Sequence, residues 1–94
     1  LAKQTTKVKA NGKKKIKVSW KKDKKASGYE ITYSTKKSFK GKKTIVVKSN
    51  KTTSKVVKKL TSKKKYFVKV RSYKQVGKTK TYGAYSKVKT VKVK

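Results

Sequence analysis

The segment from residue 60 to residue 72, LTSKKKYFVKVRS, constrains the fold more than any other, because its side chains alternate in character. Residues of one parity are mostly apolar, whereas the other parity carries the cations. The first set is Tyr66, Val68, Val70 and Ser72, and the second is Phe67, Lys69 and Arg71. Successive side chains of a β-strand point to opposite faces, so this pattern predicts a half-buried strand whose apolar set faces a core.

Residue usage favours an all-β protein. Val occurs 12 times, Thr 11 times and Tyr 6 times, whereas Leu occurs twice and Met is absent. β-branched and aromatic residues suit the pleated, half-buried surface of a strand, and few of the best helix formers other than Lys are present. A chain of 94 residues can build one core without a disulfide or a metal. We therefore expect a single all-β domain over residues 1–94.

The chain lacks the side chains on which most catalytic and metal sites depend. It contains no Cys and no His, which excludes disulfides, thiol chemistry and imidazole catalysis from within the chain. Asp23 and Glu30 are the only carboxylates, and no catalytic motif joins them. No glycine-rich phosphate loop is present. We predict a domain that is not an enzyme and has no catalytic, metal-binding or cofactor-binding residues.

Alternation interrupted by turn residues predicts seven short strands. No connection has the length or the helical period of a crossover, so an antiparallel sandwich is favoured over a parallel sheet. In the second strand, Trp20 shares its parity with Ile16 and Val18, which predicts a core position for the single Trp. The predicted strands cover residues 3–10, 13–20, 29–34, 43–48, 55–60, 66–72 and 85–93.

The third and fourth strands and the loop between them carry separate expectations. In the third strand the inward set is Tyr29, Ile31 and Tyr33, and the outward set is Glu30, Thr32 and Ser34. Adjacent valines at 46–47 and 56–57 leave the registers of the fourth and fifth strands open. Phe39, in the loop before the fourth strand, is expected to plug the end of the core rather than to bind a ligand.

The last two predicted features lie near the C-terminus. Residues 74–81, KQVGKTKT, are expected to form a polar hairpin loop around Gly77. In the last strand, Val88 and Thr90 share one parity, whereas Val91 and Val93 share the other. A bulge or kink near Thr90 would reconcile the two sets.

The sequence shows no membrane or export signal. No run approaches the ~18 apolar residues of a membrane-spanning helix, and no leader pattern precedes a cleavage site. The chain begins at Leu1 without a Met, and we expect it to be a segment of a larger multidomain protein.

Three sets of residues together resemble the fibronectin type III domain, and the resemblance covers essentially the whole chain. They are Trp20 after Ile16 and Val18, the strand Tyr29-x-Ile31-x-Tyr33, and Leu60 followed six residues later by Tyr66-x-Val68-x-Val70. The resemblance implies a seven-stranded antiparallel Greek-key β-sandwich of the immunoglobulin-like kind. Strands one, two and five would form one sheet, and strands three, four, six and seven the other.

The resemblance also implies structural roles for four residues. Trp20 and Tyr29 would pack in the core, and Tyr66 would form a tyrosine corner beside Leu60. The Tyr66 hydroxyl would then bond to the backbone of the turn just upstream.

Two departures from the common family pattern limit the functions that the resemblance implies. The chain has no Pro, and no Arg-Gly-Asp precedes the last strand, so integrin recognition by that tripeptide is not implied. It is most similar to lysine-rich, tyrosine-rich members found in tandem in surface and secreted proteins of Gram-positive bacteria. The resemblance implies a monomeric, extracellular spacer or adhesion-supporting accessory domain, with the neighbouring domains of its parent chain as partners.

The net charge suggests an alternative function. The chain carries 33 Lys plus Arg against 2 Asp plus Glu, a balance of +31, and such a surface attracts polyanions. It could be a dedicated binding module for anionic cell-wall or host polymers, namely teichoic acid, acidic glycans or extracellular nucleic acid. Arg71 is the single Arg, and because bidentate recognition of base edges favours Arg, we expect no sequence-specific binding to nucleic acid.

One group of aromatic and cationic residues is the candidate surface for polyanion binding or ring stacking. It consists of Phe67, Lys69, Arg71, Tyr73, Tyr82 and Tyr85. The structural interpretation of the same residues is that the rings carry lysine stems and shield the sheet. Glu30 is expected to pair with Lys69 or Arg71 across neighbouring strands.

Overall fold

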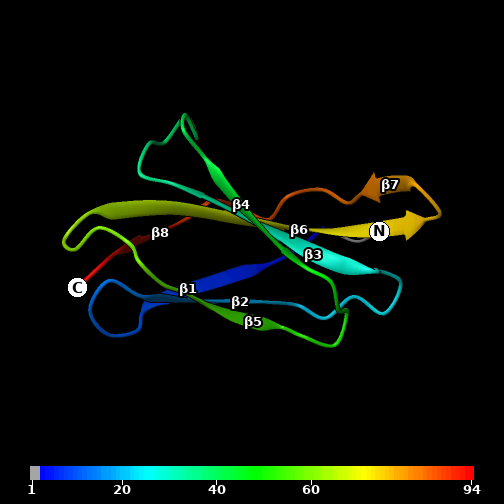
Figure 1. Ribbon diagram of the computed structural model, residues 1–94, viewed down its shortest axis with the longest axis horizontal. Coiled ribbons are helices and arrows are strands. Elements are labelled where there is room, and N and C mark those ends of the chain that lie inside the picture. Colours follow the sequence, from blue (N-terminus) through cyan, green and yellow to red (C-terminus); the bar gives the residue numbers. More distant parts are fainter. Residues whose placement is uncertain (1–2) are drawn as a thin grey trace.

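The computed structural model of this chain describes residues 3–94, so Leu1 and Ala2 of the predicted domain lie outside the described residues. Two antiparallel sheets pack face to face (Figure 1). The first sheet has the order β1-β2-β5 and the second the order β4-β3-β6-β7, with β8 also pairing β6. The strands are β1 (Thr6–Ala10), β2 (Ile16–Trp20), β3 (Gly28–Ser34), β4 (Lys43–Val47), β5 (Ser54–Val57), β6 (Lys65–Val76), β7 (Thr79–Tyr82) and β8 (Lys89–Lys92). The all-β prediction and the predicted division into two sheets are confirmed, with β8 as the predicted last strand.

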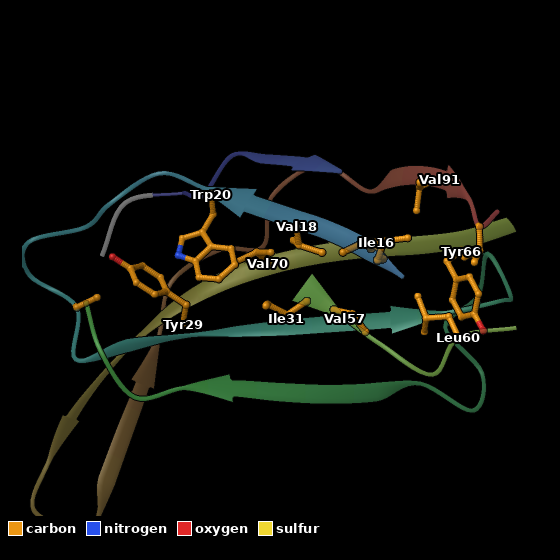
Figure 2. Close-up of a cluster of buried hydrophobic side chains, with 13 residues drawn as sticks. Ile16, Val18, Trp20, Tyr29, Ile31, Val57, Leu60, Tyr66, Val70 and Val91 are labelled. Atoms are coloured by element: carbon orange, nitrogen blue, oxygen red, sulfur yellow. The ribbon is translucent and has the colours of Figure 1, made fainter. Parts of the chain in front are cut away.

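The core lies between the inner faces of β2, β3 and β6 (Figure 2). Ile16, Val18 and Trp20 of β2 are buried, as their shared parity predicted. The ring centroids of Trp20 and Tyr29 lie 5.5 Å apart and the rings are tilted by 52°, a geometry that aromatic pairs prefer over a parallel sandwich. The Trp20 indole donates to the Thr52 carbonyl at 3.1 Å, so burial leaves its N–H satisfied. The predicted core positions of Trp20 and Tyr29 are confirmed.

The tyrosine corner forms as predicted at the start of β6. The Tyr66 hydroxyl accepts the backbone N–H of Thr61 at 2.9 Å, and Leu60 is buried beside the Tyr66 ring (Figure 2). The Leu60 N–H donates to the Lys14 carbonyl at 3.0 Å, which ties the connection between the sheets to the β1–β2 turn. The corner therefore fixes where β6 enters the second sheet.

Polar bonds close the sandwich where β1 meets the segment before β8. Thr6 Oγ1 of β1 donates to Ser86 Oγ at 2.7 Å, and Ser86 Oγ also accepts the Val70 N–H at 3.1 Å. The Ser86 N–H donates to the Val70 carbonyl at 2.8 Å. Thr6 and Ser86 are buried, and these bonds satisfy their hydroxyls while joining the two sheets.

The segment predicted as a polar hairpin loop does form a hairpin, but most of it is paired strand and the loop itself is only a two-residue turn. β6 continues to Val76 and β7 begins at Thr79, and Val76 pairs with Thr79 across a two-residue turn. Gly77 has φ of 60°, the left-handed conformation that such turns require. Exposed polar residues obscured the strand in the sequence, because both faces of the projecting hairpin meet solvent. The predicted boundary at residue 74 was wrong, although Gly77 does make the turn.

The last strand is shorter than predicted and has no bulge near Thr90. β8 covers only Lys89–Lys92, with Val91 and Val93 buried and Val88 46% exposed. The two parities therefore face opposite sides of a regular strand. The irregular segment lies earlier, at 83–88, where Ser86 rather than Val88 is buried.

The two open registers are now settled. Ile45 and Val47 of β4 pack against the core, whereas Val46 between them is 39% exposed. In β5, Val57 is buried and pairs with Ile16 of β2. In both strands, pairing with a neighbouring strand sets which residues face inward. The adjacent valines in the sequence could not reveal this register.

Replacing Tyr66 with Phe tests the corner. The substitution keeps the ring but leaves the Thr61 N–H without its partner. We expect the free energy of unfolding, measured by urea denaturation, to fall by about 1 kcal/mol or more. The matched control is Tyr82→Phe, on a ring that is 41% exposed, which should change stability by less than about 0.5 kcal/mol. Equal stability of Tyr66→Phe and the parent chain would show that the corner bond contributes nothing.

Candidate binding face

The candidate surface forms on the outer face of the second sheet, the side turned away from β1, β2 and β5. Phe67, Lys69, Arg71 and Tyr73 are the outward parity of β6, as predicted. Tyr82 of β7 pairs with Tyr73, and Tyr85 lies in the segment between β7 and β8. Pleating and pairing thus bring five of the six predicted residues together, while the cation over the ring of the sixth, Phe67, is Lys65, whose Nζ lies 5.8 Å from the ring centroid.

Cations and rings alternate across this face in a stack that we call the aromatic–cation ladder. Its members, in order, are Phe39, Lys69, Tyr85, Arg71 and Tyr82. Lys69 Nζ lies 4.4 Å from the Phe39 ring centroid and 4.2 Å from that of Tyr85. Arg71 Cζ lies 4.6 Å from the Tyr85 centroid and 3.7 Å from that of Tyr82. Each cation is therefore held between two rings, at distances where cation–π attraction is effective.

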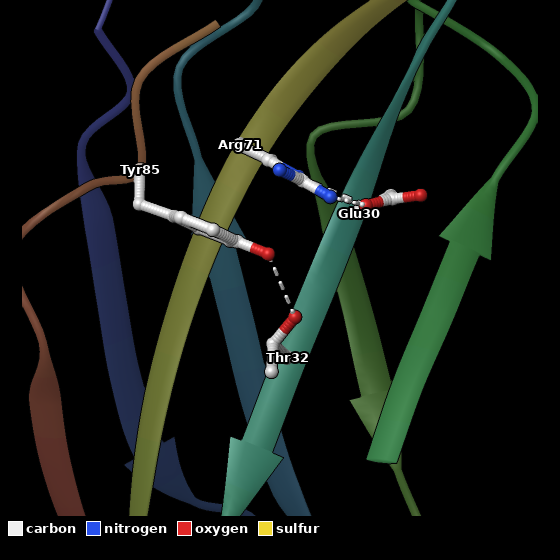
Figure 3. Close-up of polar contacts among 4 residues, drawn as sticks. All are labelled: Glu30, Thr32, Arg71 and Tyr85. Atoms are coloured by element: carbon white, nitrogen blue, oxygen red, sulfur yellow. Dashed lines mark hydrogen bonds and ion pairs between the residues drawn. The ribbon is translucent and has the colours of Figure 1, made fainter. Parts of the chain in front are cut away.

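An ion pair anchors the ladder to β3. Arg71 and Glu30 are direct cross-strand partners, and Arg71 Nη2 lies 2.8 Å from Glu30 Oε1 (Figure 3). Arg71 Nε donates to the same oxygen at 2.9 Å. The Glu30 side chain is only 9% exposed, so pairing compensates a carboxylate that burial would otherwise disfavour. Of the two partners expected for Glu30, the structure selects Arg71.

Tyr85 covers the polar residues of β3. Its ring reaches over β6, and its hydroxyl lies 3.4 Å from Thr32 Oγ1 (Figure 3). Glu30, Thr32 and Ser34 do have the outward parity, but all three are buried. The predicted outward parity is therefore correct, but it does not mean exposure, because Tyr85 lies over Thr32 and the neighbouring β3–β4 loop bonds to Ser34 through the Lys40 carbonyl at 2.9 Å.

Tyr73 is not available for ring stacking with a ligand. It is 3% exposed and pairs with Gly28, whose missing side chain leaves room for the ring. A Cβ at residue 28 would lie 2.7 Å from the Tyr73 hydroxyl. Lys80 Nζ lies 4.8 Å from the centre of the Tyr73 ring. The Gly28–Tyr73 contact is therefore a packing feature.

Phe39 is the ladder residue that the sequence did not reveal. We expected it to plug the end of the core, but it is absent from the core cluster and stacks on Lys69 instead. Its backbone has φ of 60°, uncommon for a residue other than Gly, and this turn aims the ring back over the sheet. A loop aromatic beside Gly41 was the only signal, and it does not specify which face the loop covers.

Other chemistry is sparse in the part of the chain that the structure describes. Residues 3–94 contain no group of three or more His, Cys, Asp or Glu side chains that could hold a metal ion. Burial, and next the nearby Tyr66, raises the pKa of Tyr33 above its ordinary value of 10.0. Within the same residues, no helix is long and apolar enough to cross a membrane.

Comparison with known families decides the identity of the fold. The profile of the family described as "Fibronectin type III domain" matches residues 4–89. The chain belongs to the fibronectin type III family. The predicted resemblance is confirmed at this level, and the sheets, the buried Trp20 and the Tyr66 corner are features of this fibronectin type III domain.

Solved structures show the same fold. Chicken CNTN1 FN1-FN3 domains are similar at 25% identity and a TM-score of 0.81, over 97% of this chain and 30% of that one. The fibronectin type III domain of human contactin 1 is similar at 21% identity and a TM-score of 0.80, over 95% of this chain and 73% of that one. A structure described as a myokine is similar at 21% identity and a TM-score of 0.77, over 98% and 96%. No curated protein matches the chain.

Replacing Arg71 with Gln tests the ladder. The substitution leaves the buried Glu30 carboxylate without its partner and removes a cation from between two rings. We expect the free energy of unfolding to fall by about 2–3 kcal/mol, less than for a fully buried pair because Arg71 keeps some contact with water. Lys69→Gln, on the same face without a carboxylate partner, should cost only about 1 kcal/mol.

A double-mutant cycle with Glu30→Gln isolates the ion pair. The sum of the losses in unfolding free energy of the two single variants should exceed the loss of the double variant by more than about 0.5 kcal/mol. Strictly additive losses in urea denaturation would mean that Arg71 acts only through the rings.

Proposed function

We propose that this fibronectin type III domain is a non-catalytic, extracellular spacer or adhesion-supporting accessory domain of a larger surface or secreted protein. The observation that carries the proposal is the position of its two ends. Gln4, near one end of the described chain, bonds to Lys21 before the β2–β3 loop. At the other end, the Lys94 carbonyl accepts the Lys14 N–H in the β1–β2 turn. These turns lie at opposite ends of a body 40 Å long (Figure 1).

Such an arrangement suits a domain that adds length to a chain of domains. Neighbours joined to opposite ends are held apart by the long axis, and antiparallel pairing along that axis resists extension. The contactin structures support the proposal, because a similar domain occurs there within a chain of several domains, and this chain spans 30% of the chicken one. On this basis we propose that the parent protein has further domains on either side, and that the domain is a monomer.

The state of the candidate surface also favours a structural role. Lys69 and Arg71 are already engaged by rings, and Arg71 by Glu30. A ligand would have to displace these contacts before it could use either cation. The structural interpretation of the ladder, in which rings carry cations and shield the sheet, is therefore the better supported one. We also propose that this domain belongs to the lysine-rich, tyrosine-rich members found in surface and secreted proteins of Gram-positive bacteria, because its composition resembles theirs.

Joining two copies end to end tests the spacer role. Small-angle X-ray scattering of the tandem should give a maximum dimension close to twice the 40 Å of one copy. A control tandem with a flexible Gly/Ser linker of about 15 residues should give a broader distance distribution. A direct tandem no longer than a single copy would contradict the proposal. Sedimentation of the single copy, expected to be a monomer, completes the test.

Anionic-polymer binding is a second candidate, favoured by one surface feature. Lysines gather around two adjacent depressions that share Lys3 and Gln4. We call these lysines the β1 patch; they are Lys3, Lys7, Lys21, Lys22, Lys24, Lys25, Lys87 and Lys89. Such a concentration of cations would bind a polyanion by counterion release, with little demand on geometry.

Charge-matched variants separate a binding patch from a uniformly basic shell. One variant changes Lys21, Lys22, Lys24 and Lys25 to Gln, and the control changes four scattered exposed lysines, Lys13, Lys37, Lys48 and Lys51. Binding to dextran sulfate is measured at several salt concentrations. If the patch binds, its neutralisation should weaken binding much more than the control does and should flatten the salt dependence. Equal losses in the two variants would remove the patch as a site.

A further inference from the structure

A groove at the tyrosine-corner end of the sandwich has the features of a small-ligand site. It opens where β3 ends, and residues of the β3–β4 loop, the start of β4 and the β5–β6 connection line it. Tyr33 and Tyr66 contribute their side chains from β3 and β6. Its volume is about 380 Å³, within the range of pockets that hold small molecules. The groove is distinct from the ladder and from the β1 patch.

The charge of the groove selects for anions. Lys43, Lys58 and Lys59 line it, and no carboxylate does. Among residues 3–94, none of these three ammonium groups has a carboxylate at ion-pair distance or a ring face beneath it. They differ in this respect from Lys69 and Arg71. A lysine ammonium carries three donors and no acceptor, so the three together offer donors only to an anion.

Hydroxyl groups provide a second kind of contact. The Tyr33 and Tyr66 ring centroids lie 6.2 Å apart, and both rings line the groove. Tyr66 Oη accepts the Thr61 N–H, which leaves its proton free to donate. Tyr33 Oη makes no hydrogen bond to any residue of the described chain. Thr35 also lines the groove. Because hydroxyls both donate and accept, they match a ligand that itself carries hydroxyls.

The backbone at one groove lysine, Lys59, is fixed before any ligand arrives. Lys59 has φ of 60°, a left-handed conformation that is unfavourable for a residue other than Gly. The next residue, Leu60, is buried and bonded through its N–H to the Lys14 carbonyl. This anchoring fixes the strained turn, and a strained, over-determined backbone is a recurrent feature of binding sites.

We propose that this groove binds a phosphate or sulfate ester carried on a sugar or polyol. The three lysines would bind the ester oxygens, and the hydroxyls of Tyr33 and Tyr66 would bind the ligand's own hydroxyls. This inference does not rest on the spacer role. It also differs from polymer binding at the β1 patch, because a groove of this size saturates with one small ligand.

Glucose 6-phosphate, glucose 6-sulfate, inorganic phosphate and glucose are the probes. In two-dimensional NMR titrations at physiological salt, glucose 6-phosphate should give saturable shifts at the Tyr33 and Tyr66 rings and at the amides of Lys43, Lys59 and Thr61. Inorganic phosphate should bind more weakly, and glucose should give no shifts. The sulfate ester should bind at the same residues if a sulfated glycan is the source, and several-fold more weakly if a phosphorylated polymer is.

Charge-matched variants decide whether the site is specific. Lys43→Gln, Lys58→Gln and Lys59→Gln together should abolish the saturable shifts. The control, Lys9→Gln, Lys48→Gln and Lys78→Gln, removes the same charge at exposed positions outside both the groove and the β1 patch and should bind as the parent chain does. Tyr33→Phe should weaken binding of glucose 6-phosphate about tenfold, the effect of one hydrogen bond to the ligand.

Three results would overturn the proposal. They are equal losses in the two triple variants, shifts spread over lysines across the whole surface, and glucose bound as tightly as its phosphate. Thermal unfolding of each variant confirms that it is folded, and since the substituted lysines are exposed, we expect the native transition in all of them.

Discussion

Packing of β2 against β3 and β6 holds together a domain whose net charge of +31 opposes compaction. The charges repel one another over a range of ~8 Å at physiological salt, so burial of apolar surface must supply the opposing free energy. That burial comes from a thin core in which Trp20, Tyr29 and Tyr66 are the largest side chains. Hydrogen bonds between buried polar groups also join the two sheets at their edges. The Tyr66 corner and the Thr6–Ser86 contact satisfy buried groups where the two sheets meet.

The outer face of the second sheet shows how the same chain uses cations as packing material. Lys69 and Arg71 lie between rings, and Arg71 pairs with the buried Glu30 of β3. One carboxylate, Glu30, is placed where it neutralises Arg71. Among residues 3–94, no Lys has a carboxylate at ion-pair distance. In the corner groove, Lys43, Lys58 and Lys59 remain available, and for that reason the groove is the better candidate for a specific ligand.

Local patterns predicted the elements where one face is buried and the other is solvated. The alternation in 66–72 and the shared parity of Ile16, Val18 and Trp20 gave the correct inward faces, because a side-chain period of two is read directly from the sequence. Prediction failed where both faces have the same surroundings. The tip of the β6–β7 hairpin is solvated on both faces, so most of its residues are polar, they show no alternation, and the segment resembles a loop. The adjacent valines in β4 and β5 gave no parity at all.

The sequence by itself determined the all-β class, the antiparallel sandwich and the absence of Cys and His chemistry, because these depend on residue type and short-range spacing. The sheet membership and the corner at Tyr66 were implied by the resemblance to the fibronectin type III family. Only the tertiary structure decided which cations are engaged and which are free. Phe39, Lys69 and Tyr85 are far apart in sequence, and nothing local specifies that they stack. The groove at the tyrosine-corner end likewise combines residues from two connections and three strands, and its shape exists only once the two sheets have packed.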